Sequence, residues 1–253
     1  MIQLFNGDCM EVMDSLIEQG VVVDAIITDP PYGTTACKWD SVIPFEPMWE
    51  RLNKLIKPNG AIVLFGSEPF SSALRMSNIK RYKYDWVWDK KAGLGFLDAK
   101  FRPLKSHENI LVFGLDGSGV SNGSKTPLIY NPQGVTQTTK TNRNNPSDIL
   151  NYEPRVREFK NAKTGYPKSV ICFSKNKKCQ HPTQKPVALM EYLIKTYTNQ
   201  GEVVLDFTMG SGSTIVGCKN TGRSGIGIED KEDIFAMAKN RIDKTIGEFN
   251  HIF

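Results

Sequence analysis

The stretch VVLDFTMGSGSTIVGCKNTGRSGIGIE, residues 203–229, decides the fold. An apolar strand ends in Asp206, a turn with the residues Gly210-Ser211-Gly212 follows, and a helix begins near Ser213. The next strand ends in Glu229. In a doubly wound sheet, such a glycine turn lets the backbone approach a nucleotide, the helix N-terminus offers free N–H groups, and the acid accepts hydrogen bonds from ribose hydroxyls. The stretch therefore predicts a nucleotide-cofactor site.

Strand-like apolar runs alternate with helix-like amphipathic runs around this stretch. Such alternation favours a parallel sheet that is covered by helices on both faces. The sequence thus predicts an α/β fold with a doubly wound, mostly parallel, seven-stranded Rossmann-like sheet. Strands are expected at residues 1–5, 21–28, 61–65, 84–88, 109–113, 203–206 and 225–229, and helices at 10–18, 46–56, 69–78, 186–196, 213–219 and 233–246.

Residues 116–180 are rich in Gly, Ser, Asn, Thr, Lys and Pro and poor in apolar periodicity. They hold eight lysines and three arginines against two aspartates and two glutamates, in a chain whose net charge is +5. A local basic excess is typical of a site for a nucleic-acid backbone, and it also fits a solvated loop. We expect one α/β domain, with halves at residues 1–115 and 181–253, split by a basic insertion at residues 116–180.

The composition excludes several classes of protein. With 253 residues and a mean hydropathy of −0.34, the chain is typical of ordinary globular proteins. It has no apolar run of about 18 residues and no signal-peptide pattern, so neither a membrane span nor secretion is expected. The five cysteines lack Cys-x-x-Cys spacing and the three histidines form no ligand cluster, which favours a reducing cytoplasm and no metal.

A second unusual stretch, AIITDPPYGTT, covers residues 25–35. An apolar strand ends in Asp29, and Pro30, Pro31 and Tyr32 follow. Consecutive prolines cannot donate backbone hydrogen bonds, so the strand ladder must stop here. A plain strand end and turn explains most tetrapeptides of this kind, so a functional interpretation depends on agreement with the rest of the chain.

The tetrapeptide Asp29–Tyr32 and the downstream turn Asp206–Gly212 together resemble the amino-methyltransferases that modify exocyclic amines in DNA with S-adenosylmethionine. Their beta class has the same order, with the catalytic tetrapeptide first, the target-recognition segment second and the cofactor turn last. One departure is Thr208, because the family commonly has Asp-Pro-Phe-x-Gly-Ser-Gly where this chain has Asp-Phe-Thr-Met-Gly-Ser-Gly. Further matching pieces are Gly7-Asp8, Cys37-Lys38-Trp39-Asp40, Phe65-Gly66-Ser67, Trp86-Val87-Trp88-Asp89-Lys90 and HPTQKP at 181–186.

The resemblance implies a chemical role for the tetrapeptide. The lone pair of an exocyclic amine is delocalised into the base, so acceptors for its N–H groups favour the pyramidal nitrogen that attacks a methyl group. Asp29 and the backbone carbonyl of Pro30 would be those acceptors, with Pro31 helping to fix the carbonyl direction. Tyr32 would stack on a base extruded from the duplex. All four residues are therefore expected to be catalytic.

The resemblance also assigns residues to the cofactor and to DNA. Glu229 is expected at the ribose, Asp8 near the adenine, and His181, Thr183 and Lys185 at the methionine end. The full set expected at S-adenosylmethionine is Asp8, Cys9, Asp29, His181, Thr183, Lys185, Asp206, Thr208, Gly210, Ser211, Gly212, Ser213 and Glu229. The set expected at DNA is Trp39, Arg143, Arg155, Arg157, Lys160, Lys163, Lys175, Lys177 and Lys178.

Adenine N6 in double-stranded DNA is the substrate that the resemblance favours, because the N4-cytosine enzymes of this family more often carry Ser at the position of Asp29. Cytosine N4 is the near alternative. The resemblance further implies a cytoplasmic enzyme of prokaryotic or viral origin, a homodimer and a cognate restriction endonuclease. The pair His107-Glu108 is interpreted as a hydrogen-bonded strand entrance.

Three other functions fit less well. RNA or a protein amide as substrate is disfavoured, because such relatives usually carry Asn at position 29 and lack a basic insertion here. An inactive DNA-binding protein with this fold is expected to show damage in its motifs, which are intact. An NAD-dependent oxidoreductase leaves the tetrapeptide unexplained, and Ile215 breaks the fuller Gly-x-Gly-x-x-Gly pattern.

Overall fold

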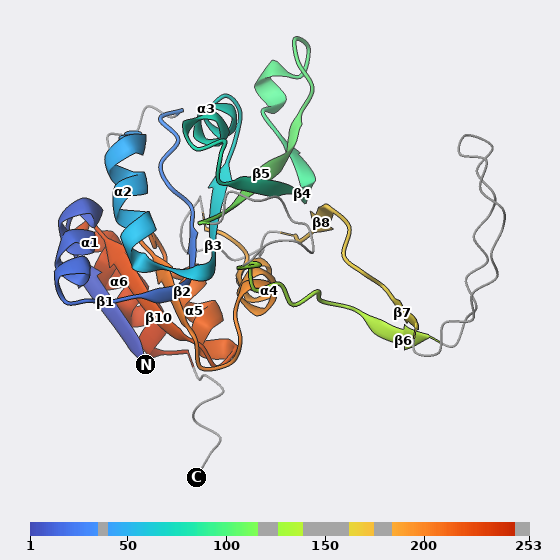
Figure 1. The fold of residues 1–253 in the computed structure, drawn as a ribbon. Coiled ribbons are helices and arrows are strands. Elements are labelled where there is room, and N and C mark those ends of the chain that lie inside the picture. The colour runs from blue at the N-terminus through green and yellow to red at the C-terminus, as the bar shows by residue number, and fades with distance from the viewer. Residues whose placement is uncertain (35–39, 116–125, 139–161, 175–183, 246–253) are drawn as a thin grey trace. The chain divides into compact units, whose positions relative to one another are not determined.

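Figure 1 shows the computed structural model, which describes residues 1–34, 40–115, 126–138, 162–174 and 184–245. Two compact units make up the chain, one of Met1–Asn131 and Ser169–Phe253 and one of Pro132–Lys168. The strands of the larger unit are β1 (Ile2–Asn6), β2 (Val23–Thr28), β3 (Ile56–Gly66), β4 (Tyr82–Leu94), β5 (Lys105–Gly114), β8 (Val170–Cys172), β9 (Val203–Asp206) and β10 (Ser224–Glu229). Its helices are α1 (Cys9–Glu18), α2 (Phe45–Leu55), α3 (Phe70–Ser77), α4 (Val187–Tyr197), α5 (Ser213–Asn220) and α6 (Glu232–Asp243), with a 3-10 turn η1 (Phe96–Asp98).

The strands of the larger unit form one sheet in the order β1-β10-β9-β2-β3-β5-β4-β8. Only β5 among them runs antiparallel to its neighbours, so the mostly parallel α/β fold predicted from the sequence is confirmed. The sheet has one strand more than the seven expected. The extra strand is β8, which pairs with β4 and contributes only three residues, too few to show a periodic pattern in the sequence.

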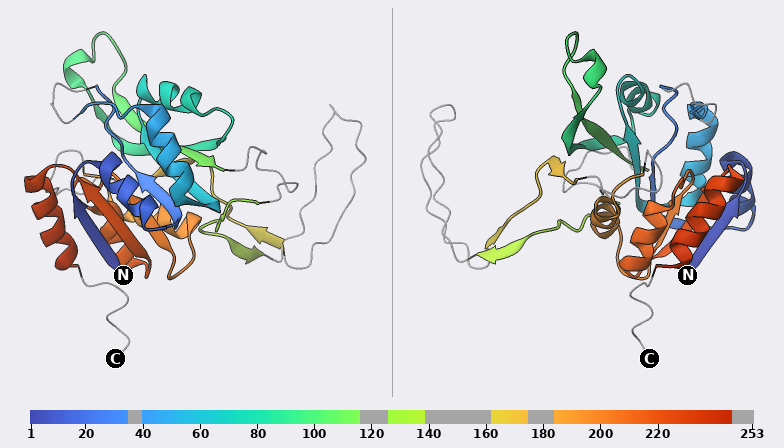
Figure 2. Two further views of the ribbon diagram at one scale, coloured as in Figure 1. Left: turned by 60° about the vertical axis from the view of Figure 1, so that its left-hand side comes forward. Right: turned by 180° about the vertical axis from the view of Figure 1, so that it is seen from behind.

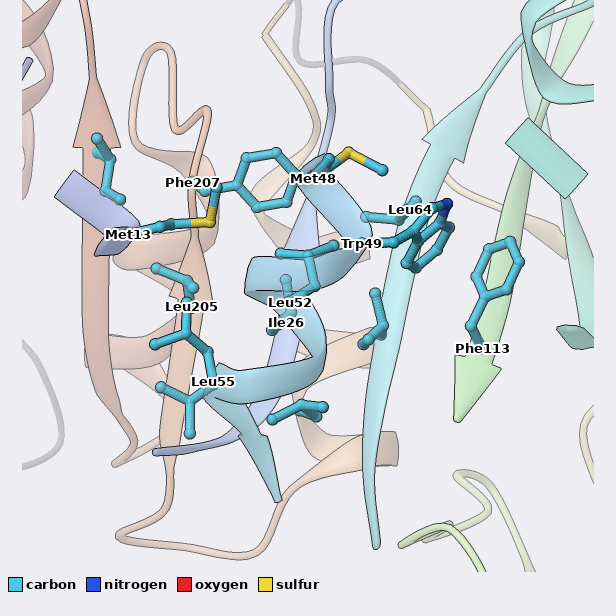
Figure 3. Close-up of a cluster of buried hydrophobic side chains, with 14 of the residues drawn as sticks. Met13, Ile26, Met48, Trp49, Leu52, Leu55, Leu64, Phe113, Leu205 and Phe207 are labelled. Carbon is cyan, nitrogen blue, oxygen red and sulfur yellow. The ribbon is translucent and has the colours of Figure 1, made fainter. Parts of the chain in front are cut away.

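Helices cover both faces of the sheet (Figures 1 and 2). The buried side chains of α1, α2 and α3 pack on one face, and those of α4, α5 and α6 pack on the other. Successive side chains of a strand point to opposite faces of the sheet. Ile26 of β2 therefore belongs to the first core and Ile27 to the second. Figure 3 shows the first core, where Trp49 and Leu52 of α2 lie over the sheet.

Two strands are longer than predicted, because residues without strand propensity continue their ladders. The break expected after residue 56 is a bulge inside β3, where Val23 pairs with Ile56 and Ala25 pairs with Ala61. Gly60 fits this bulge, since a Cβ there would lie 2.6 Å from the carbonyl oxygen of Asp24. Strand β4 continues past its predicted end at residue 88 because β5 pairs with it on both sides of a register shift, with Asp89 opposite His107 and Leu94 opposite Lys105.

The smaller unit, Pro132–Lys168, contains a two-stranded antiparallel ladder in its described part. Strands β6 (Thr136–Thr138) and β7 (Ala162–Thr164) pair with Gln137 opposite Lys163. The larger unit holds both flanks of this segment by hydrogen bonds. The N–H of Asn131 donates to Thr196 O over 2.7 Å, and Ser169 O accepts from the N–H of Val87 over 2.8 Å.

None of the helices in the described ranges combines the length and the apolar composition that crossing a membrane requires.

Candidate active site

The candidate site lies at the carboxyl edge of the parallel strands, where open α/β sheets bind their ligands. Residues from separate strands surround a cavity of about 650 Å³ there. They include Asp8 after β1, Asp29 after β2, Asp206 at the end of β9, Glu229 at the end of β10 and Lys90 near the end of β4. The cavity belongs entirely to the larger unit of the chain.

Both carboxylate oxygens of Asp29 accept hydrogen bonds. Tyr32 Oη donates to Oδ1 over 2.5 Å, and Lys185 Nζ donates to Oδ2 over 2.5 Å. The same ammonium lies 5.1 Å from the centre of the Phe65 ring and 5.9 Å from that of Tyr32, within range of cation–π attraction. Lys185, which the sequence predicts at the methionine end of the cofactor, is thus in direct contact with the tetrapeptide.

Glu108 extends this cluster with a second acid and a second lysine. Its Oε2 lies 3.1 Å from Lys185 Nζ, in ion-pair contact but without hydrogen-bond geometry, and its Oε1 accepts from Lys90 Nζ. The side chains of Lys90 and Lys185 are only 5% and 10% exposed. The sequence predicts Glu108 just before a strand at residues 109–113. That position is wrong, since Glu108 lies within β5 and lines the cavity.

The charges in this cluster control each other's protonation. Burial raises the pKa of Asp29, and the Lys185 ammonium opposes that rise. Burial also disfavours ionised Glu108, but Lys185 and Lys90 outweigh it and lower its pKa to about 2. Burial opposes the charge of Lys185, yet Asp29 and Glu108 raise its pKa above the ordinary value. Near neutral pH, Lys185 is therefore a cation, and of its two acidic partners Asp29 has the higher pKa.

Thr208 connects the cofactor turn to the tetrapeptide. Its Oγ1 donates to the carbonyl oxygen of Asp29 over 3.1 Å and lies 2.8 Å from Oγ1 of Thr28. Thr28 Oγ1 in turn donates to Oδ1 of Asp206 over 2.5 Å. The ring that the family commonly has at this position is replaced by a hydroxyl that ties the end of β2 to the end of β9.

Asp40 fixes the loop that follows the tetrapeptide. Its Oδ1 accepts from the N–H groups of Tyr32 and Gly33 over 2.7 and 2.9 Å, and its Oδ2 accepts from that of Thr34 over 2.8 Å. Three N–H groups converging on one buried carboxylate restrict the backbone at Tyr32. The sequence motif contains Asp40, but residue spacing alone gives no sign of this contact.

The glycine turn and Glu229 form the opposite wall of the cavity. Gly210 has a φ of 49°, and a Cβ there would have no atom within 4 Å, so its backbone faces open space. Its N–H donates to Oε2 of Glu229 over 3.0 Å, and the N–H of Lys231 donates to Oε1 over 3.0 Å. An ionised carboxylate has about four acceptor positions, so Glu229 retains acceptor capacity for a ligand.

Three further contacts hold this wall in place. Asp8 caps helix α1, because its Oδ1 accepts from the N–H groups of Met10 and Glu11 over 2.8 and 3.3 Å. Arg241 of α6 donates to the carbonyl oxygen of Ser211 over 2.7 Å. Ser213 Oγ donates to the carbonyl oxygen of Lys185 over 2.9 Å, which joins the cofactor turn to the segment that carries this lysine.

The structure brings most of the predicted site residues together. Gly212 does not line the cavity, because a Cβ at this position would lie 2.7 Å from Cδ1 of Ile242. Its φ of 74° is part of the turn conformation. The predicted residues that line the cavity are Asp8, Cys9, Asp29, Pro30, Pro31, Tyr32, Lys185, Asp206, Thr208, Gly210, Ser211, Ser213 and Glu229.

The remaining predictions mostly lie outside the described residues. Lys163 is described and is exposed on β7. The predicted residues outside the described ranges are Trp39, Arg143, Arg155, Arg157, Lys160, Lys175, Lys177, Lys178, His181 and Thr183.

The chain resembles a family model and known proteins over most of its length. A family model described as DNA methylase, for N6 and N4 methyltransferases, matches residues 23–240. A type II methyltransferase of Haemophilus parainfluenzae, M.HpaI, is 30% identical over 99% of this chain and 77% of its own length. The solved complex of M1.HpyAVI with SAM has a TM-score of 0.64 at 30% identity, covering 95% of this chain and all of that one.

A second solved structure is similar in fold alone. The cytosine-N4-specific PvuII DNA methyltransferase has a TM-score of 0.67 at 15% identity, covering 98% of this chain and 89% of that one.

Proposed function

The chain belongs to the N6/N4 DNA methylase family, and from this membership we propose that it methylates N6 of adenine at specific sites in double-stranded DNA. It is a DNA methyltransferase, and its cofactor is S-adenosylmethionine. The observation that carries the proposal is the contact of Asp29 and the glycine turn with one cavity. The roles of the individual residues belong to the same proposal.

The cavity suits the cofactor in its shape and its polar groups. The open space over Gly210 admits a ligand close to the backbone, and Glu229 offers acceptors for ribose hydroxyls. Ile228 and Ile234 also line the cavity and provide an apolar wall for the cofactor. The cofactor, when bound, supplies an electrophilic methyl group on a sulfonium.

Asp29 and the Pro30 carbonyl act on the amine of the target base. Each accepts a hydrogen bond from an N–H, which favours the pyramidal nitrogen with an available lone pair. Lys185 holds Oδ2 of Asp29 and fixes the plane of its carboxylate, so Oδ1 is the oxygen left for the amine. Glu108 and Lys90 act through Lys185 as positioning residues. Glu108 forms an ion pair with each of the two lysines, which holds the Lys185 ammonium in place.

Tyr32 and the amine of the target base would both bond to Oδ1 of Asp29. The Tyr32 hydroxyl donates to this oxygen over 2.5 Å, and a carboxylate oxygen has a second lone pair for the amine. Burial raises the pKa of Tyr32 well above its usual value, so the phenol remains a neutral donor. Its ring stacks on Phe70 with the centroids 5.0 Å apart, which provides an aromatic platform beside the cavity.

Adenine is favoured over cytosine by the carboxylate at position 29, where the family's N4-cytosine enzymes more often carry Ser. The basic insertion contributes phosphate contacts through its lysines and arginines. A homodimer and a cognate restriction endonuclease remain predictions from the resemblance. Light scattering of the purified protein tests the first, and cleavage of unmethylated DNA by a co-encoded nuclease tests the second.

The test is incubation with tritiated S-adenosylmethionine and unmethylated duplex DNA of mixed sequence, followed by chromatography of the nucleosides. We expect label in N6-methyladenine and a loss of at least about a hundredfold in the Asp29→Ala variant. The control is Asp14→Ala, which removes an acid on α1 outside the cavity. Label in N4-methylcytosine would reverse the base assignment, and cofactor and DNA binding without label would contradict the proposed activity.

A further inference from the structure

The connection between β4 and β5 carries exposed apolar side chains that the site described above does not use. This connection, Lys91–Leu104, is called the β4–β5 tip. Phe96 is 81% exposed, Leu97 is 95% exposed and Phe101 is 89% exposed. Three large apolar side chains so close together in sequence and so exposed are unusual on the surface of a monomer and mark an interaction site.

The tip has its own folded structure. Leu94 pairs with Lys105 at its base, and η1 closes with hydrogen bonds from the N–H of Asp98 to Gly95 O and from the N–H of Phe101 to Asp98 O, over 3.0 and 2.8 Å. Arg102 pairs with Asp98 across the turn. The backbone is therefore internally bonded, while its largest apolar side chains point away from any core.

The position of the tip relates it to the cavity. Strand β4 runs parallel to β2, with β5 between β3 and β4, so β4 ends at the edge of the sheet where Asp29 lies. Lys90 and Leu94, at the base of the tip, line the cavity themselves. The tip thus begins at the rim of the cavity. Figure 1 shows it as an extended hairpin between β4 and β5.

The charge of the tip favours a polyanion as the occupant. It carries Lys91, Lys100 and Arg102 against one acid, Asp98. Apolar side chains flanked by cations are suited to enter a base stack while the cations contact the phosphates on either side. A duplex that delivers one base to the cavity has a gap in its stack beside the rim.

We propose that Phe96, Leu97 and Phe101 of the β4–β5 tip insert into the DNA base stack at the step opened by extrusion of the target base. The proposal rests on the proposed function and adds to it the surface that stabilises the opened duplex. It assigns the apolar tip to base extrusion, separately from the phosphate contacts of the basic insertion.

The test first maps the methylated site by sequencing modified DNA, and then uses two synthetic duplexes of that site. One is fully paired, and the other has a mismatched partner opposite the target base. The variant is Leu97→Ser with Phe101→Ser, and the matched control is Met76→Ser with Ile79→Ser, which removes exposed apolar side chains in and after α3. Cofactor binding by each variant checks that the fold is intact.

The tip variant is expected to lose about tenfold or more in kcat/KM on the paired duplex and about twofold or less on the mismatched duplex, whose target base is already unpaired. Equal losses on both duplexes, or no loss on either, would overturn the inference. A loss that accompanies conversion of a dimer to a monomer in light scattering would assign the tip to a second copy and also overturn it. If the wild-type protein methylates neither duplex nor mixed-sequence DNA, the proposed function fails first.

Discussion

At the scale of single residues, the site depends on how the two oxygens of Asp29 are used. Lys185 holds one of them and Tyr32 holds the other. In the proposed reaction, the acceptor for the amine must be ionised and must have a free lone pair. Ionised Asp29 meets both conditions, because each of its oxygens accepts one hydrogen bond and retains a second lone pair.

The acid limb of the activity profile reports on Lys185. Protonated Asp29 no longer offers a carboxylate to the amine, so activity falls as the pH drops through its pKa. Because Lys185 opposes the rise that burial causes in that pKa, Lys185→Met is expected to move the acid limb to higher pH and to lower kcat. The measurement is kcat against pH with saturating cofactor.

The same variant distinguishes two roles for Lys185. A residue that acts through Asp29 changes the pH profile and kcat, whereas a residue that binds the cofactor changes the cofactor Kd. We expect Lys185→Arg, which keeps the charge, to restore the position of the acid limb in part. A cofactor Kd weakened by more than about tenfold, with an unchanged pH profile, would return Lys185 to the cofactor.

Asp206 makes stability depend on pH in the opposite direction to most aspartates. Burial raises its pKa from the ordinary value of 3.8 to about 6 in the folded chain, and the hydrogen bonds from Thr214 and Thr28 only partly offset this rise. The favourable contribution of protonated Asp206 to the free energy of unfolding is complete below about pH 4 and is lost as the pH rises through about 6. Asp206→Asn, which removes the titration, is expected to be more stable than wild type at pH 8 by up to about 3 kcal/mol.

Urea unfolding of both proteins at pH 8 and at pH 4.5 measures this difference. The difference in free energy of unfolding between wild type and Asp206→Asn should narrow at the lower pH, where Asp206 of the folded wild type is protonated. A difference that widens on acidification would show that Asp206 is ionised at low cost in the folded protein.

At the scale of elements, the side chain of Asp40 holds residues 32–34, which follow β2. Asp40 receives three backbone N–H groups, from Tyr32, Gly33 and Thr34. Asp40→Ala leaves these donors without that acceptor and loosens the backbone beside Asp29. We expect a fall of about ten- to a hundredfold in kcat, because small displacements of a positioned group are costly.

Cofactor affinity is the internal control for Asp40. The residues on the far wall, Gly210 and Glu229, bond to each other rather than to the loop that Asp40 holds, so the cofactor Kd of Asp40→Ala should stay close to that of wild type. Equal losses of cofactor affinity and kcat would indicate general unfolding of the site rather than a local loop effect.

Elements that a local residue pattern marks could be predicted from the sequence. Elements that form only by pairing with a distant strand could not. Strand β9 begins and ends where expected, because its apolar residues and Asp206 precede a glycine turn. The residues of β3 at 57–60 read as a break, yet partner strands accommodate them as a bulge. Strand β8 exists only through its ladder with β4.

The same distinction applies to the candidate site. Asp29, Asp206 and Glu229 were predictable because each ends an apolar strand. The cluster of Lys90, Glu108 and Lys185 was not, since Lys185 and Asp29 lie 156 residues apart and meet only in the folded sheet. The resemblance supplied Lys185 as a motif residue but assigned it to the cofactor.

At the scale of the whole molecule, the charge distribution predicts how DNA binding responds to salt. The insertion carries the basic excess, including Lys175, Lys177 and Lys178, which lie outside the described residues. Each phosphate contact that is lost lowers the slope of log K against log salt by about 0.9. Replacing these three lysines by Gln is expected to lower the slope by about two to three.

Exposed lysines elsewhere provide the control. Lys54 on α2 and Lys80 after α3 are exposed and lie outside the insertion, so Lys54→Gln with Lys80→Gln should leave the slope nearly unchanged. Fluorescence anisotropy of labelled duplex DNA over a range of salt concentrations gives both slopes. Equal slopes for wild type and the triple variant would remove these lysines from the DNA contact.

The two anchored flanks of the smaller unit have a consequence for how such an enzyme changes its target. Asn131 is fastened to α4 and Ser169 to β4, each by a backbone hydrogen bond within the larger unit. The chain between them therefore begins and ends at residues that the larger unit holds, and all the residues around the cavity belong to that larger unit. The expected role of the insertion in target recognition then predicts that exchange of residues 132–168 changes the DNA sequence that is methylated and leaves the residues of the cavity as they are.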